Sequence, residues 1–214
     1  MSYSRDAKKL LRSGLRARLA AVSTADIATW SGQIVARIET LPEYAAARTV
    51  LMFVPMANRP EVDLRPLIQS ALAAGKAVCL PRTDWVARTM TARRVTDLAD
   101  LEPDAAAPSA AGLQHPRESC PTVPPQELDL LFTPGLGFDL TGGRIGHGAG
   151  FYDRFLAQPS VRGVVCGVGL EAQLLAPGEE LPRDLHDRPV EMLVTESRVI
   201  RYDRSGAGGQ AAPG

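Results

Sequence analysis

The chain has 214 residues, of which 45% are hydrophobic, and this suits one full-sized domain with a substantial core. Lysine plus arginine equals aspartate plus glutamate at 24 each, so no overall field would draw the protein to nucleic acid or to an anionic membrane. The composition favours a small ligand that is recognised locally.

The chain opens with a pattern typical of two helices. Residues 5–22 carry leucines at helical spacing with lysines and arginines on the other faces, which predicts a basic amphipathic helix. Residues 24–40 repeat the helical spacing and stop before Pro42. The sequence therefore predicts an N-terminal helical pair.

Short apolar runs separated by helical segments follow, as in an α/β protein. Residues 49–54 and 77–80 are predicted to be buried strands around a helix at 62–74, and Pro81 is expected to close the second strand. This order is a βαβ unit. Later elements are expected as strands at 128–133 and 163–170, a helix at 152–157 between them, and a terminal hairpin of strands 191–195 and 198–202.

Two segments are predicted to lie outside these elements. Between Leu98 and Pro125 the sequence is rich in Ala, Pro and Ser, so we expect a long surface connection there. The tail 205–214 is rich in Gly and Ala and is expected to be a flexible end. We predict a single domain over residues 1–204, followed by that tail.

The cysteines indicate the compartment. Cys79, Cys120 and Cys166 are odd in number, widely spaced and without a CxxC pair, which argues against a disulfide framework or a thiolate zinc site. The first residues lack the apolar core of a signal peptide, and no run approaches the roughly 18 apolar residues of a membrane span. We therefore expect a cytoplasmic protein.

A glycine-rich stretch at residues 133–154 holds seven of the 19 glycines and lies between a predicted strand and a predicted helix. Glycine lets backbone N–H groups approach an anion, and α/β sheets bind ligands at this position. The spacing of Gly146, Gly148 and Gly150 is not the dinucleotide fingerprint, and the Gly-Lys pair of the chain lacks the Ser or Thr of a Walker A loop. We expect a phosphate cradle of another kind; a mobile turn is the alternative.

Charged residues around this stretch have the chemistry of a nucleotide site. Asp153 and Asp187, together with phosphate oxygens, would make a magnesium site. Taken singly, Asp153 could instead stabilise a helix N-terminus, and Asp187 could pair with Arg188. Glu61 follows the first strand and is either a ligand contact or a residue of the next helix's first turn. His147 lies inside the glycine stretch and is expected to contact ligand.

Six ordered segments resemble the 5-formyltetrahydrofolate cyclo-ligase family, also called 5,10-methenyltetrahydrofolate synthetases. They are residues 8–12, 60–63, 74–82, 128–139, 144–154 and 185–190. The resemblance implies an α/β fold of three αβα layers with a mainly parallel, modified Rossmann-like sheet.

The resemblance also implies a ligase that uses ATP and Mg²⁺. ATP phosphorylates the formyl oxygen of 5-formyltetrahydrofolate, a neighbouring folate nitrogen closes the ring, and ADP and phosphate leave, which gives 5,10-methenyltetrahydrofolate. Such chemistry needs positioning and charge neutralisation more than a protein nucleophile, which suits a site of glycines, arginines and carboxylates.

The family's site residues carry over to positions of this chain. Arg144, Tyr152 and Asp153 would be catalytic, and Asp153 and Asp187 would bind the metal. ATP would contact Lys8, Lys9, Arg12, Arg144, Ile145, Gly146, His147, Gly148, Ala149, Gly150, Phe151 and Tyr152. The folate would contact Val54, Glu61, His147, Gly148, Ala149, Gly150 and Phe151.

Three positions depart from the family pattern. Phe151 replaces a common tyrosine, Ala149 stands where Gly or Lys is expected, and His147 stands where other residues, including Arg, occur. The alternative function is a nucleotide-binding relative that takes another pterin or a thiamine-like ligand. An RNA-binding module using the basic helix is disfavoured by the neutral charge and by the lack of interleaved aromatic residues. We expect a monomer without nucleic-acid or membrane partners.

Overall fold

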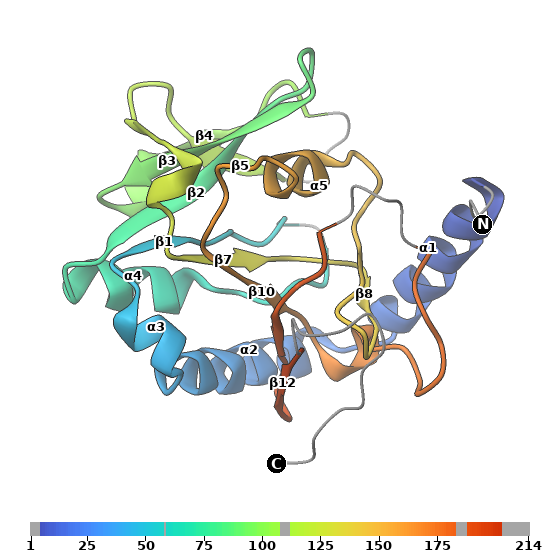
Figure 1. Cartoon of the computed structure of the whole chain (residues 1–214). Helices are drawn as coiled ribbons and strands as arrows, with labels where there is room; N and C mark the ends of the chain where they lie inside the picture. The colour runs from blue at the N-terminus through green and yellow to red at the C-terminus, as the bar shows by residue number, and fades with distance from the viewer. Residues whose placement is uncertain (1–4, 58, 108–111, 183–187, 203–214) are drawn as a thin grey trace.

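A computed structural model describes residues 5–57, 59–107, 112–182 and 188–202. Its main feature is an eight-stranded sheet with helices on both faces (Figure 1). In spatial order the strands are Val199–Arg201 (β12), Met192–Val194 (β11), Val164–Val168 (β10), Leu130–Thr133 (β7), Thr49–Leu51 (β1), Ala77–Asp84 (β2), Thr89–Val95 (β3) and Thr122–Val123 (β6). The five strands from β11 to β2 run parallel, whereas β12, β3 and β6 are antiparallel to their neighbours. The predicted mainly parallel sheet is confirmed.

The helices make two unequal layers over this sheet. The helices are Arg5–Ala20 (α1), Thr24–Glu39 (α2), Pro42–Ala46 (α3), Arg65–Ala73 (α4) and Phe151–Leu156 (α5). Because side chains alternate along a strand, Val50 of β1 packs into the core under α1, α2 and α4, while Leu51 packs into the core under α5. Figure 1 shows α2 and α4 on one side of the sheet and α5 on the other. The three-layer αβα prediction is therefore confirmed, with one short helix in the second layer.

The N-terminal helical pair forms as predicted. The hydroxyl of Ser23 accepts a hydrogen bond from the backbone N–H of Asp26 and so caps α2. In α1, Leu15 and Leu19 are buried one turn apart, while Leu10 is 77% exposed. In the described part of the chain, each helix is too short or too polar to cross a bilayer.

The expected end of the second strand is wrong, because β2 continues past Pro81 to Asp84. The backbone N–H of Ala77 donates to the carbonyl of Arg48, so the backbone N–H and C=O groups of the odd-numbered residues of β2 point towards β1. The pairing with β1 ends at Cys79. At Pro81 no neighbouring strand therefore requires a backbone N–H donor, and the lack of this group in proline does not interrupt the sheet. The extension pairs with β3, an element that the sequence analysis missed.

The connection predicted at residues 98–125 holds short elements of its own. Leu101–Pro103 (β4) and Gln114–Pro116 (β5) form a two-stranded ribbon, and the strand β6 follows. The glycine-rich stretch contains a second ribbon, of Gly137–Phe138 (β8) and Arg144–Ile145 (β9). The predicted C-terminal hairpin is confirmed by the antiparallel β11 and β12. Residues 205–214 lie outside the described residues, and the division into one domain and a tail stays a prediction.

Candidate functional site

A pocket of about 210 Å³ lies at the carboxyl ends of β1, β2 and β7. In α/β proteins this edge of the sheet is where ligands bind. Four groups of residues line the pocket: Phe53, Val54, Met56, Arg59 and Glu61 after β1; Pro81, Thr83, Trp85 and Met90 from β2 and β3; Ala107, Leu113, Gln114 and His115 around β5; and Pro134, Arg144, Gly146, His147, Ala149, Gly150, Phe151, Tyr152 and Asp153.

Most of the predicted site residues meet at this pocket, and the lining includes both Val54 and Glu61. Ile145 is buried in β9 beside it. Lys8 is half-buried on α1, whereas Lys9 is exposed there and makes no hydrogen bond or ion pair with the described residues. The two lysines therefore lie on the predicted helix but outside the pocket wall.

Two glycines give the floor its shape. Gly148 and Gly150 have φ angles of +111° and +70°, which L side chains rarely adopt. A Cβ on Gly150 would also lie 2.8 Å from Nη1 of Arg154. Arg154 holds the loop from outside, because its Nη2 donates to the carbonyl of Ala149 at 2.8 Å. We refer to residues 146–150 as the glycine loop.

The basic helix lies directly against the glycine loop. Nε of Arg12 donates to the carbonyl of Gly146 at 3.0 Å, and Nη2 of Arg16 is 3.4 Å from the carbonyl of His147. A Cβ built on Gly148 would lie 3.7 Å from Cζ of Arg12, so the guanidinium of Arg12 lies within van der Waals distance of the loop at this residue. The structure thus brings the N-terminal motif and the glycine loop together.

Arg144 and Tyr152 each have a buried polar atom without a hydrogen-bond partner among the described residues. The Arg144 side chain is 5% exposed; its Nη2 donates to the carboxylate of Asp153, and its Nη1 donates to the carbonyl of Pro134 at 3.1 Å. Its Nε and the hydroxyl of Tyr152 are buried and have no hydrogen-bond partner among the described residues. Burial raises the pKa of Tyr152, so the hydroxyl stays protonated and able to donate. Unsatisfied donors in a pocket wall are groups that a ligand satisfies.

Asp153 has the features of a metal ligand that shares its metal with phosphate. Its side chain is 40% exposed, and one oxygen accepts from Arg144 while the other has no donor among the described residues. Mg²⁺ is commonly held by one or two carboxylates plus phosphate oxygens, which this arrangement fits. No cluster of three His, Cys, Asp or Glu side chains occurs in the described chain, so an all-protein cage is absent there. Asp187 lies outside the described residues.

His147 joins the glycine loop to the loop after β1. Its Nδ1 is 3.2 Å from Nη1 of Arg59, and its Nε2 is 3.1 Å from Oε1 of Glu61. The other oxygen of Glu61 accepts from the backbone N–H of Met56 at 2.9 Å. The sequence analysis missed Arg59, although an arginine two residues before the candidate Glu61 was a visible signal.

Trp85 and Phe151, the residue that follows the glycine loop, form an aromatic wall of the pocket. Trp85 packs edge-on against Phe151 with ring centroids 4.7 Å apart and an angle of 87°. The indole Nε1 of Trp85 and the hydroxyl of Thr83 both donate to one oxygen of Asp104, at 2.9 and 3.0 Å. Burial alone would raise the pKa of Asp104, but these hydrogen bonds outweigh it and hold that pKa below its usual range. No sequence pattern predicts this wall, because it depends on how the unpredicted β3 and the β4–β5 ribbon fold back.

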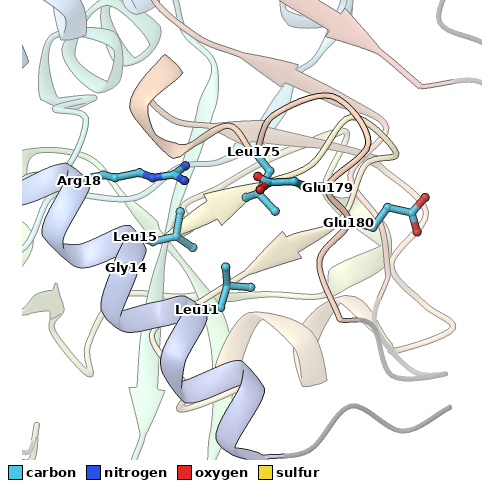
Figure 2. Close-up of a pocket in the computed structure, with 7 residues that line it drawn as sticks. All are labelled: Leu11, Gly14, Leu15, Arg18, Leu175, Glu179 and Glu180. Atoms are coloured by element: carbon cyan, nitrogen blue, oxygen red, sulfur yellow. The ribbon is translucent and has the colours of Figure 1, made fainter.

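A second hollow, of about 360 Å³, lies on the other side of α1 (Figure 2). Its lining consists of Leu11, Gly14, Leu15 and Arg18 from α1 and Leu175, Glu179 and Glu180 from the facing loop. This hollow has two carboxylates and one arginine, Arg18. The first pocket is also lined by two carboxylates, but Arg59 and Arg144 line it too, and Arg12 and Arg16 contact its glycine loop, so positive charge is in excess there. The phosphate side of a nucleotide therefore fits the glycine loop better.

Comparisons with known proteins agree with this geometry. A sequence profile of the 5-formyltetrahydrofolate cyclo-ligase family matches residues 4–196. A probable 5-formyltetrahydrofolate cyclo-ligase of Schizosaccharomyces pombe is 29% identical over 91% of this chain and 97% of its own. The 5-formyltetrahydrofolate cyclo-ligase of Escherichia coli K12 is 31% identical over 79% of this chain and 90% of its own.

Solved structures of 5,10-methenyltetrahydrofolate synthetases are similar to this chain. The structure of Aquifex aeolicus 5,10-methenyltetrahydrofolate synthetase superposes with a TM-score of 0.75 and 32% identity, over 95% of this chain and 96% of that one. A 5,10-methenyltetrahydrofolate synthetase from Mycoplasma pneumoniae, at 18% identity and a TM-score of 0.67, shares the fold over 88% of this chain and 98% of its own. The chain belongs to the 5-formyltetrahydrofolate cyclo-ligase family.

Proposed function

We propose that this protein converts 5-formyltetrahydrofolate to 5,10-methenyltetrahydrofolate, consuming ATP in the presence of Mg²⁺ and releasing ADP and phosphate. The observation that carries the proposal is the contact of Arg12 with Gly146, because it places a basic helix on the glycine loop at the floor of a ligand-sized pocket. The names of the relatives support the choice of substrate.

The ATP phosphates bind between α1 and the glycine loop. Arg12 and Arg16 already contact this loop, and Lys8 and Lys9 lie one turn earlier on the same helix. Guanidinium groups neutralise phosphate oxygens and hold them in a fixed direction, which is the main requirement in phosphoryl transfer. Asp153, with Asp187, holds Mg²⁺, which neutralises charge on the transferred phosphoryl group.

The folate ring system occupies the pocket between the glycine loop and the aromatic wall. Val54 and Phe151 supply apolar surface, Trp85 supplies an aromatic edge, and Glu61 accepts hydrogen bonds from ring N–H groups. This pose directs the formyl group towards Arg144 and Tyr152, whose unpartnered donors stabilise charge on the formyl oxygen.

Bond changes then follow from positioning. The formyl oxygen attacks the γ-phosphorus, an O–P bond forms, and the bond to ADP breaks. The neighbouring folate nitrogen attacks the activated carbon and loses its proton, and phosphate departs with the former formyl oxygen. No protein nucleophile is needed, because the attacking groups all belong to the substrates.

We also infer a monomer in the cytoplasm. Cys79, Cys120 and Cys166 are free and buried, which supports a reducing compartment.

A comparison of candidate substrates tests the proposed activity against the alternative of a relative that takes another pterin or a thiamine-like ligand. Purified protein is incubated with ATP, Mg²⁺ and each candidate in turn, and ADP and the organic product are quantified by chromatography. We expect one ADP per methenyl product with 5-formyltetrahydrofolate alone. Nucleotide binding by calorimetry without turnover of any reduced folate would support the alternative, and strongly salt-dependent RNA binding would support an RNA-binding module.

A further inference from the structure

We propose that Arg59 and His147 are positioning residues that hold the carboxylate of Glu61 ready for the substrate. This inference rests on the proposed function, in which Glu61 contacts the folate. The residues come from two loops: Arg59 and Glu61 follow β1, whereas His147 belongs to the glycine loop. His147 therefore links the folate wall of the pocket to its phosphate floor.

The contacts select one tautomer of His147. A guanidinium group has donors and no acceptor, so Nδ1, 3.2 Å from Nη1 of Arg59, must present its lone pair. The proton of the neutral ring is then on Nε2, which donates to Oε1 of Glu61 at 3.1 Å. Hydrogen bonds consequently run in one direction, from Arg59 through His147 to Glu61.

Glu61 is restrained at both oxygens and remains open to ligand. Its side chain is 10% exposed, and Oε2 is held by the backbone N–H of Met56 at 2.9 Å. A carboxylate has about four lone-pair directions, and His147 and Met56 occupy one on each oxygen. No further donor among the described residues reaches this carboxylate, so the remaining directions can accept from a molecule in the pocket, whose wall Glu61 forms.

Nitrogen NMR of the free protein tests the positioning without any substrate. The chain has three histidines, so His147 is assigned by the signal that disappears in His147→Gln. We expect an unprotonated Nδ1 and a protonated Nε2 on the neutral ring. In Arg59→Met, which removes the donor to Nδ1, the tautomer with the proton on Nδ1 should become detectable. A parent ring protonated on Nδ1, or a tautomer ratio that Arg59→Met leaves unchanged, would overturn the proposal.

Kinetics then tests the role in catalysis. At neutral pH, Arg59→Met should raise the KM for 5-formyltetrahydrofolate about fivefold, as for one hydrogen bond lost, with little change in kcat. His147→Leu should raise this KM further, and His147→Gln should recover part of the loss, because an amide both accepts and donates.

The matched control is Arg65→Met, which removes an arginine that pairs with Asp63 on the same stretch of chain and is 53% exposed. It should leave both the His147 tautomer and the KM as they are. A KM that neither Arg59→Met nor His147→Leu raises would contradict the positioning role. If the NMR results hold but no folate is turned over, the proposed function fails while the Arg59–His147–Glu61 arrangement stands.

Discussion

Nε of Arg12 donates a hydrogen bond to the backbone carbonyl of Gly146 at 3.0 Å, across 134 residues of chain. This bond attaches the first helix to the glycine loop, which lies at the end of the sheet between β9 and α5. The helix and the loop together form a basic surface beside the pocket. The proposed binding of the ATP phosphates depends on this surface.

Replacement of Arg12 should weaken ATP binding specifically. Arg12→Gln removes a charge and the bond to Gly146, so we expect the KM for ATP to rise on the order of tenfold or more, with a smaller change in the KM for folate. Steady-state kinetics with each substrate varied in turn measures both. Arg18→Gln on the same helix is the control, because Arg18 faces the second hollow (Figure 2). Equal effects of the two variants would argue against the assignment.

The metal assignment predicts a large effect at Asp153. Asp153→Asn keeps the size of the side chain but removes the charge, so kcat should fall on the order of 100-fold and the Mg²⁺ concentration for half-maximal rate should increase. A Mg²⁺ titration of the rate is the measurement. The thermal midpoint without ligands should fall as well, because the change removes the carboxylate that pairs with the buried guanidinium of Arg144. Unchanged Mg²⁺ dependence would remove Asp153 from the metal site.

The shape of the glycine loop predicts that Gly148 tolerates no side chain. Gly148→Ala places a Cβ at a φ of +111°, which L residues rarely adopt, so the backbone of the loop must change conformation and the KM for ATP should rise at least several-fold. Gly32→Ala is the control, because Gly32 lies inside α2 with open space around it. That change should stabilise the protein by about 0.5–1 kcal/mol in urea unfolding. Normal ATP affinity in Gly148→Ala would show that ATP binding does not depend on this backbone conformation.

Stability should decline in acid partly through Asp139. This carboxylate is fully buried and accepts hydrogen bonds from the backbone N–H groups of Leu181, Thr141 and Gly143. Burial would raise the pKa of Asp139, but these hydrogen bonds outweigh it and lower the pKa below its usual value. Because the folded pKa is the lower one, the contribution is present above the unfolded value of about 3.9 and is lost as pH falls below it.

Urea unfolding at neutral pH and near pH 3.5 measures this loss. Asp139→Asn should cost about 2 kcal/mol at neutral pH and should show a smaller difference between the two conditions. Asp84→Asn, at an exposed turn, should behave like the parent protein. A variant at Asp139 with the parent's full acid sensitivity would show that other groups cause it.

Two of the buried thiols should resist alkylation in the folded state. Burial raises the pKa of Cys79 to about 12 and also raises the pKa of Cys166. The thiolate is the reactive form, so neither residue should be labelled by iodoacetamide at pH 8 until denaturant is added. Mass spectrometry of the labelled peptides reports each site. Rapid labelling of either cysteine without denaturant would show that its core opens readily.

The elements predicted well from the sequence are those with a local signal. The β1–α4–β2 unit follows from apolar runs around an amphipathic segment, and the short helix α5 follows the glycines as expected. The strand β3 has the period-two signal, since buried Met90 and Ala92 alternate with the more exposed Thr91 and Arg93, but few of these residues are strongly apolar. The predicted end of β2 at Pro81 was wrong because a proline ends a strand only where a neighbouring strand requires its N–H. Whether that holds at Pro81 depends on where β1 ends, which the residues around Pro81 do not show.

The site divides in the same way. The glycine loop and Asp153 are contiguous in sequence, so composition and resemblance lead to them. Arg59, Trp85 and Asp104 reach the pocket only through long-range packing, and no spacing rule joins them to the glycine loop.

The most direct measurement is the formation of 5,10-methenyltetrahydrofolate by the purified protein, followed by its absorbance. We predict an absorbance signal that requires 5-formyltetrahydrofolate, ATP and Mg²⁺ together. The reaction should release one ADP per methenyl product, and its rate should fall sharply in Asp153→Asn. Protein that is folded and binds ATP, yet forms no methenyl product with all three present, would contradict this prediction.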